Sequence, residues 1–452
     1  MKNSQINNAP KKITNKPAIG AAALALALLI SALQSRTGEA APAHAGSSAA
    51  GFKAICALIN LAAQKPAPAV LPAATVEEIE ETLALINLTL MAPQAVEELG
   101  KQGKTPINWD KEGTAVKQHC GAEHRSKCEK AKKRASNHAD AAVIAAARKL
   151  QKATGTAEAV HSIIVAINKA LAEYSTQSKA AVDMSITSDL EQALGTKTDA
   201  TAAVKLKGAQ TDRATTCGNP GTNTKGKAAG VSLAVDIICL CGSDSTSGET
   251  NDACTLKTQT GNIDYASSEK DVKDEWDKLA RECKEQYPQT PLTAKALRTA
   301  LLTFDTEVAK SQGTNKNIIN TLGYIAGAGT NGCDGSNGAT HGACVYYGKD
   351  NAKKNPLQPA WRTHITNAIA KLQATEDATA KAHSAAARLE TLNNTLTSLI
   401  FLGAVSSQKT HQATETATQS KSREIYAQEA AKKECEKANC KWKGWESETK
   451  VD

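Results

Sequence analysis

Four residues near position 120 have the types and spacing that could bind a metal ion. His119, Cys120, His124 and Cys128 would offer two imidazoles and two thiolates, a ligand set that zinc accepts. The chain lacks a second pair of ligands at the spacing of a zinc finger, and its twelve cysteines, an even number, are typical of a secreted protein with disulfides. The sequence therefore favours oxidised cysteines here and predicts no metal site.

Three other patterns have a chemical interpretation and a simpler one. Residues 327–332 match G-x-G-x-x-G but lead into Cys333, without the helix whose dipole would bind a phosphate. The acidic run Glu77–Glu81 is typical of a solvated helix start, where carboxylates meet the positive end of the dipole. The basic run Lys127–Arg134 has no interleaved aromatic residues to stack on bases, which favours a solvated helix face over nucleic-acid binding.

No positive evidence for catalysis appears in the sequence. A nucleophile with a suitably placed base, an HExxH pattern and a P-loop are all missing. We therefore expect a protein that is not an enzyme, with no catalytic residue and no cofactor.

Two long amphipathic segments must form the scaffold that positions the loops. One runs from Glu129 to Tyr174 and the other from Trp361 to Ser406. Apolar residues step by threes and fours along both, as on one face of a helix. At ~1.5 Å per residue, about 45 residues of the second segment would span roughly 65 Å. Alanine at many of these positions allows close approach but buries little area, so the pairing must be long. The sequence predicts a mainly α fold, built on two long antiparallel coiled-coil-like helices. Gly155 is a candidate break in the first, and a bundle of shorter helices is the alternative.

The cysteines lie outside the interior of the two helical segments, where loops must be tied to the helices. They are Cys56, Cys120, Cys128, Cys217, Cys239, Cys241, Cys254, Cys283, Cys333, Cys344, Cys435 and Cys440. Cysteines that are adjacent but one rarely bond to each other, so Cys239 and Cys241 should reach different segments. Cys333 and Cys344 enclose glycine and small polar residues, and we expect them to pair and hold the base of a variable loop.

The start of the chain has the pattern of a secretory signal peptide. A basic leader precedes the apolar run Ala18–Leu33, which is short for a membrane span, and Ala43-His44-Ala45 matches a cleavage site. A signal anchor and an upstream start codon are the alternatives. Removing residues 1–45 takes away five basic residues and one acidic residue, which roughly halves the formal net charge of +8. Charge therefore gives no indication of nucleic-acid binding.

Two N-glycosylation sequons fit an exported chain, Asn87-Leu88-Thr89 and Asn393-Asn394-Thr395. Asn393 should mark the outer face of the second long helix, because a glycan must point to solvent. Asn87 lies in the apolar run Leu83–Met91, and the sequence leaves open whether a glycan is attached to it.

Five short segments together resemble the variant surface glycoproteins of African trypanosomes, specifically the class B type of N-terminal domain. They are Ala54–Leu58, Asp236–Cys241, Ala343–Tyr347, Leu389–Leu392 and Cys435–Trp442, the last similar to the start of the small cysteine-rich C-terminal domain of that family. Each is short, but their order and the frame of long helices make the resemblance specific.

The resemblance implies a GPI-anchored coat protein on the outer face of the plasma membrane, which shields the cell and evades host antibodies by antigenic variation. It implies an elongated homodimer or homotrimer whose rod carries disulfide-tied top and bottom lobes with short strands and loops. Ser336, in the loop between Cys333 and Cys344, is by carry-over a candidate for an O-linked hexose; Ser243, Ser245 and Ser247 are rivals.

The implied domains are a signal peptide at 1–45, the variant surface domain at 46–406, a polar linker at 407–433 and the truncated start of a cysteine-rich domain at 434–452. No hydrophobic tail precedes Asp452, so the chain is expected to be a fragment or to lack an anchor. A receptor for a host serum protein on the same scaffold is the alternative function. It would need an apolar patch at the tip, where only Val345, Tyr346 and Tyr347 are near.

Overall fold

The computed structural model describes residues 45–437 except 102, 104, 111, 151–155, 198–201, 245–250, 337, 351, 353 and 354, and it describes side chains as far as residue 405, apart from that of residue 138. The expected leader, Ser245, Ser247, Cys440 and the side chain of Cys435 lie outside the described part. All described residues belong to one unit of the chain, residues 40–452.

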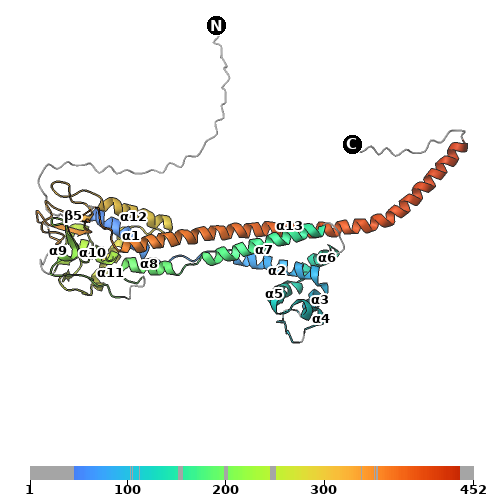
Figure 1. Cartoon of the computed structure of the whole chain (residues 1–452), viewed down its shortest axis with the longest axis horizontal. Coiled ribbons are helices and arrows are strands. Elements are labelled where there is room, and N and C mark those ends of the chain that lie inside the picture. Colours follow the sequence, from blue (N-terminus) through green and yellow to red (C-terminus); the bar gives the residue numbers. More distant parts are fainter. Residues whose placement is uncertain are drawn as a thin grey trace, which may run out of the picture. The chain divides into compact units, whose positions relative to one another are not determined.

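The fold is mainly helical, as expected, with a few short strands (Figure 1). The helices are α1 (Ala49–Ala62), α2 (Ala73–Met91), α3 (Pro93–Lys101), α4 (Thr114–His119), η1 (Ala122–His124), α5 (Arg125–Ala135), η2 (His138–Asp140), α6 (Ala141–Leu150), α7 (Thr156–Ala180), α8 (Ser185–Leu194), α9 (Arg213–Cys217), α10 (Leu233–Cys241), η3 (Asp252–Cys254), α11 (Lys273–Gln286), α12 (Ala294–Val308) and α13 (Trp361–Lys437). Strands β1 (Gly218–Asn219) and β2 (Thr224–Lys225) pair antiparallel, β3 (Ser243–Asp244) and β4 (Asn262–Ile263) parallel, and β5 (Thr321–Ile325) and β6 (Gly342–Tyr346) antiparallel. None of the described helices combines the length and apolar character needed to cross a membrane.

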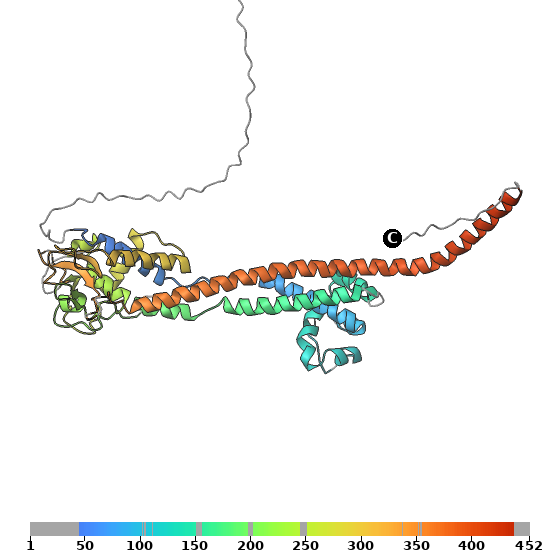
Figure 2. The ribbon, with the colours of Figure 1, turned by 45° about the horizontal axis from the view of Figure 1, so that its top comes forward.

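The expected pair of long antiparallel helices is confirmed, with α7 and α8 lying along α13 (Figures 1 and 2). Lys371 Nζ of α13 is 2.6 Å from Asp189 Oδ2 of α8, and Arg388 Nη1 is 3.3 Å from Glu173 Oε2 of α7. Gly403 of α13 lies against Leu150 and Thr156. Residue numbers therefore rise along α7 and α8 while they fall along α13.

The boundaries of the first long helix were wrongly predicted. Residues 129–174 belong to α5, η2, α6 and α7, and the partner of α13 continues through α8 to Leu194. The break before α6 has a local cause, because the Asn137 side chain accepts a hydrogen bond from the Ala139 backbone N–H and so competes with the helical pattern. The second helix continues past Ser406 to Lys437, so the segment expected as a linker at 407–433 is helical.

Small side chains let the long helices approach closely. The apolar cluster here, called the stem core, joins α2, α6, α7 and α13 and includes Ala170, Ala382 and Ala386, all at most 3 % exposed. A Cβ atom at Gly403 would clash with Leu150 Cδ1. The same cluster also contains larger apolar side chains such as Ile167 and Leu389, so the alanine-rich pattern accounts for only part of the contact.

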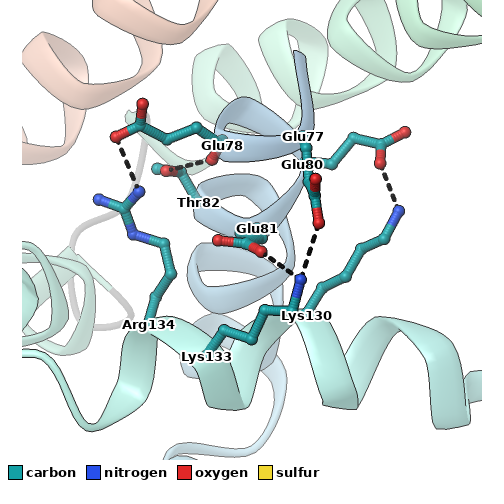
Figure 3. A network of polar contacts seen from close by, with 8 residues as sticks. All are labelled: Glu77, Glu78, Glu80, Glu81, Thr82, Lys130, Lys133 and Arg134. Carbon is teal, nitrogen blue, oxygen red and sulfur yellow. Dashed lines mark hydrogen bonds and ion pairs between the residues drawn. The ribbon is translucent and has the colours of Figure 1, made fainter. Parts of the chain in front are cut away.

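A second cluster, the lobe core, joins the C-terminal half of α2 to α3, α4 and α5. The acidic start of α2 and the basic α5, both expected as solvated faces, face each other (Figure 3), and Glu77, Glu78 and Lys133 stay more than half exposed. The contacts are Lys133 with Glu77 and Glu81, each at 2.8 Å, Lys130 with Glu80, and Arg134 with Glu78 at 3.1 Å and Asp140 at 2.8 Å. The hydrogen bond from Lys133 lowers the pKa of Glu77. Exposed pairs contribute little stability, so their main effect is to fix how α5 lies on α2.

The third cluster, the head core, is built around α10, whose nine residues are all buried. A helix without a solvent-facing side needs partners for its terminal backbone groups within the protein. Ser232 Oγ accepts from the Val235 N–H at the first turn, while Arg213 and Tyr265 donate to the carbonyls of Cys239 and Ile238 at the last. These contacts close both ends of the buried helix.

Three disulfides tie neighbouring segments to the head core. Cys239 bonds to Cys217 and Cys241 to Cys254, so the two adjacent-but-one cysteines reach different segments. Cys56 of α1 bonds to Cys283 of α11.

A buried carboxylate joins the head core to the first residue of α13. Asp236 of α10 is 0 % exposed, and its oxygens accept hydrogen bonds from Gly230 N–H (2.7 Å), Tyr347 O–H (2.9 Å) and Trp361 Nε1–H (2.7 Å). Phe304 packs edge-on against Trp361, with ring centroids 4.9 Å apart. Burial raises the pKa of Asp236 to about 7, although the three hydrogen bonds act in the opposite direction.

This raised pKa predicts a pH-dependent stability. Between the ordinary aspartate value and about 7, the folded state retains a proton that the unfolded state has released, so raising the pH favours unfolding. The contribution of Asp236 is fully present below about pH 4 and is lost as the pH rises through about 7. Asp236→Asn has no charge to bury. Relative to this variant, the free energy of unfolding of the wild type should fall by up to about 4 kcal/mol between pH 4 and pH 7. Urea unfolding of both proteins across this range measures the difference, and a difference that does not vary with pH would contradict the prediction.

Candidate functional site

The elements that form the head core are here called the head, and the helices of the stem core are called the stem. The loop between β5 and β6 is the part of the head that the sequence analysis pointed to. The β5–β6 pairing places Cys344 opposite Gly323, inside a hairpin whose β6 residues are all buried. The structure joins Cys333 to Cys344, the pairing expected from the sequence. One side of the loop is therefore fixed covalently to a strand of the head core.

Backbone contacts shape the glycine-rich half of this loop. Gly327 and Gly329 have φ angles of 56° and 66°, which side-chain-bearing residues rarely adopt. The residue after the G-x-G-x-x-G match, Cys333, donates its N–H to Gly218 O at 2.9 Å, and no helix begins there. The match is thus a set of turns and lacks the helix N-terminus that a phosphate site requires.

Ser336 lies half-buried in the second half of the loop. Its backbone N–H donates to Asp334 Oδ1 at 3.1 Å and its hydroxyl to Asp334 Oδ2 at 3.3 Å, while His341 Nδ1 contacts the same carboxylate. In a catalytic triad the imidazole stands between the serine and the carboxylate. Here the carboxylate stands between the other two, so Asp334 orders the loop and His341 is not placed to activate Ser336.

An open hollow of about 690 Å³ lies beside this loop. Its lining is almost wholly polar: Asp212, Arg213, Ala214, Thr215, Asn219, Thr222, Thr224, Asp244, Thr330, Asn331, Asp334 and Ser336. Hydroxyl, amide and carboxylate groups of this kind can donate and accept hydrogen bonds with a polyhydroxylated group. A substituent on Ser336 would have this surface, here called the head hollow, as its neighbour.

Arg213 forms the back wall of the hollow and connects it to α10. It is 1 % exposed, donates from Nη1 to Gly242 O at 2.5 Å and lies 4.7 Å from the centre of the Tyr265 ring. The negative end of the α10 dipole and the aromatic face both stabilise its charge. Burial raises the pKa of Tyr265 to about 12, so this tyrosine stays neutral beside the guanidinium.

The Cys/His group near position 120 forms a disulfide in the structure. Cys120 is bonded to Cys128, which leaves no thiolate for a metal. Within the described part of the chain, no group of three or more histidine, cysteine or acidic residues is arranged to hold a metal ion.

The modification candidates occupy different environments. Asn393 is half-buried, with its Oδ1 buried and unpaired, so it lies at the edge of the helix contact and not on the outer face as expected. Asn87 is half-buried in α2, and the Thr89 hydroxyl of its sequon is buried and donates to Leu85 O. Ser243 is 1 % exposed and has no room for a sugar in the folded protein.

The sequence matches a known protein family over most of its length. Residues 26–391 match the family model described as the trypanosomal VSG domain. The chain belongs to this family. The family resemblance is thereby confirmed, while the segment Cys435–Trp442 lies outside the match.

Two relatives are variant surface glycoproteins. ILTAT 1.25 of Trypanosoma brucei brucei is 26% identical over 276 residues, which cover 60% of this chain and 53% of that protein. YnAT 1.3 of Trypanosoma congolense is 29% identical over 202 residues, which cover 44% of this chain and 47% of that protein. The chain spans about half the length of the curated relatives it matches.

Several residues of the site carried no sequence signal. Arg213, Asp244 and Thr222 come from separate segments of the chain and line the head hollow together. Their spacing in the sequence did not predict that they would be neighbours. Asp236 was part of a segment that carried the resemblance, but its role at the junction depends on Tyr347 and Trp361, more than one hundred residues away.

Removing the loop disulfide should destabilise the head without unfolding the stem. Cys333 and Cys344 are separated by 11 residues, for which the chain-entropy model gives about 3 kcal/mol. The double variant Cys333→Ala, Cys344→Ala should unfold at lower urea concentration and be cleaved within residues 326–341 by a protease that spares the wild type. Ser336→Ala, which keeps the cross-link, is the matched control. Equal midpoints for the double variant and the wild type would show that the loop needs no covalent tie.

Proposed function

We propose that this chain is the N-terminal part of a surface coat glycoprotein, without enzymatic activity, that shields the plasma membrane of a trypanosome and evades antibodies by antigenic variation. The family match over residues 26–391 carries the proposal. The proposed location is the outer face of the plasma membrane, through a GPI anchor. The proposed boundaries are a signal peptide at 1–45, the variant domain at 46–406, a connecting segment at 407–433 and the start of a cysteine-rich domain at 434–452.

The architecture supports this function physically. At ~1.5 Å per residue, the 77 residues of α13 span about 115 Å, enough to hold a head well away from a membrane. The head presents a loop whose shape comes from backbone hydrogen bonds and the Cys333–Cys344 disulfide. Loop side chains other than Asp334, which orders the loop, can therefore change with little effect on the core, and antigenic variation needs this freedom.

The head hollow supports Ser336 as the site of an O-linked hexose, because the serine borders a polar surface of suitable hydrogen-bonding groups. Asn393 is the proposed site of an N-linked glycan, and Asn87 is a second predicted site of such a glycan. The proposed partners are further copies of this chain, as a homodimer or homotrimer, and host antibodies; no nucleic acid is expected.

Exposed apolar side chains on α13 favour self-association along the stem. Leu402 and Val405 are 66 % and 53 % exposed, and Phe401 beside them is 40 % exposed. Large apolar side chains grouped on one helix are typical of a contact with another chain. They lie beside the stretch of α13 that packs on α6 and the start of α7.

Cell-surface release tests the coat function. In the cell that makes the complete protein, a phosphatidylinositol-specific phospholipase C should release it from intact cells as the dominant surface protein, because a shield requires dense coverage. Mock-treated cells are the control. A scarce protein, or one confined to an endocytic pocket, would contradict the coat and favour a receptor for a host serum protein, to be followed by ligand capture.

Light scattering tests the proposed oligomer. The purified protein at micromolar concentration should have the mass of a dimer or trimer, and Leu402→Glu with Val405→Glu should reduce it to a monomer, because charges cannot be buried unpaired in an apolar contact. Leu302→Glu changes an equally exposed leucine of α12 (60 % exposed) and should leave the mass unchanged. A wild type that is monomeric throughout would exclude association through the stem.

A further inference from the structure

A cavity of about 790 Å³ is lined by residues of α2, α5, α6 and α7. Figure 1 shows these helices away from α10 and β5. The deeper wall of the cavity is apolar and comes from three elements: Leu88 of α2, Leu150 of α6, and Val160 and Ile164 of α7, all at most 9 % exposed. This volume is within the roughly 300–1,000 Å³ of small-molecule sites, which are mostly apolar with a few polar groups. The Cys120–Cys128 disulfide holds one edge of the cavity in place.

The rim of this cavity is basic. Lys127 and three histidines, His119, His124 and His161, line it, and none of the described lining residues is acidic. The carboxylate of Glu158 lies in a neighbouring shallow hollow that shares His161. The amides of Asn87 and Asn168 add hydrogen-bonding groups. An apolar interior with the lysine ammonium of Lys127 at its rim complements a molecule with one apolar end and one negative end.

We propose that this cavity binds a free single-chain anionic amphiphile of the fatty-acid class, with its chain against Leu88, Val160 and Ile164 and its carboxylate near Lys127. A nucleotide would leave its polar base and ribose against the apolar wall, and a neutral lipid would make no use of the basic rim. A bilayer cannot enter a cavity of this size, so the ligand is a single molecule. The inference does not depend on the coat function.

Binding of palmitate to the purified, delipidated full chain tests the proposal. Titration calorimetry should show one saturable site. Lys127→Glu should weaken palmitate about three- to tenfold and leave neutral hexadecanol unaffected. Lys169→Glu reverses a charge on α7 outside the cavity lining and is the matched control. Ala157→Trp, at an exposed position of the lining, should fill the mouth and abolish binding of both probes.

Four results would overturn the proposal. One is the absence of saturable palmitate binding, and another is equal weakening by Lys127→Glu and Lys169→Glu, which would indicate non-specific attraction. The third is binding to phosphatidylglycerol vesicles without binding to monomeric palmitate. The last is mass spectrometry of the native protein showing Asn87 fully glycosylated, because a glycan there would occupy the same space.

Discussion

The burial of one carboxylate sets how the head meets the long helix. A carboxylate at 0 % exposure is costly unless hydrogen-bond donors surround it, and Asp236 takes its donors from three separate parts of the chain. Gly230 precedes α10, Tyr347 follows β6, and Trp361 begins α13. Because all three must converge on the same two oxygens, the direction in which α13 leaves the head is fixed. The stem then depends on this direction, since α7 and α8 must follow α13 along its length.

Two different kinds of packing hold the rest together. The head core has large side chains and three disulfides around a helix with no exposed side, as well as the disulfide at the base of its loop. The stem core combines alanines with larger apolar side chains such as Ile167, Leu389 and Ile400, spread along a long contact between helices. A change of one residue there removes a small share of the contact, whereas a change at the buried Asp236 affects three parts of the chain at once.

The long-helix frame could be predicted from periodicity because its pattern is local and repeated many times. The breaks between its helices could not be predicted from periodicity. The turn at Asn137 and the start of α8 each depend on one side chain, Asn137 or Asp183, that accepts a backbone hydrogen bond. The pairing of the charged runs could not be predicted either, because it depends on contacts between distant parts of the chain. Each of the runs Glu77–Glu81 and Lys127–Arg134 looked solvated alone, and only the fold brings them together. The Cys333–Cys344 loop was visible as a sequence unit, but the head hollow was not, because its lining comes from segments far apart in the chain.

The buried state of α10 also bears on what an immune system can detect. Two of the five segments that carried the family resemblance, Asp236–Cys241 and Ala343–Tyr347, are buried throughout in the folded head. An antibody raised against the folded chain binds only what it can reach, so it could not contact these residues. These two marks of the family therefore lie where no binding partner of the folded head has access to them.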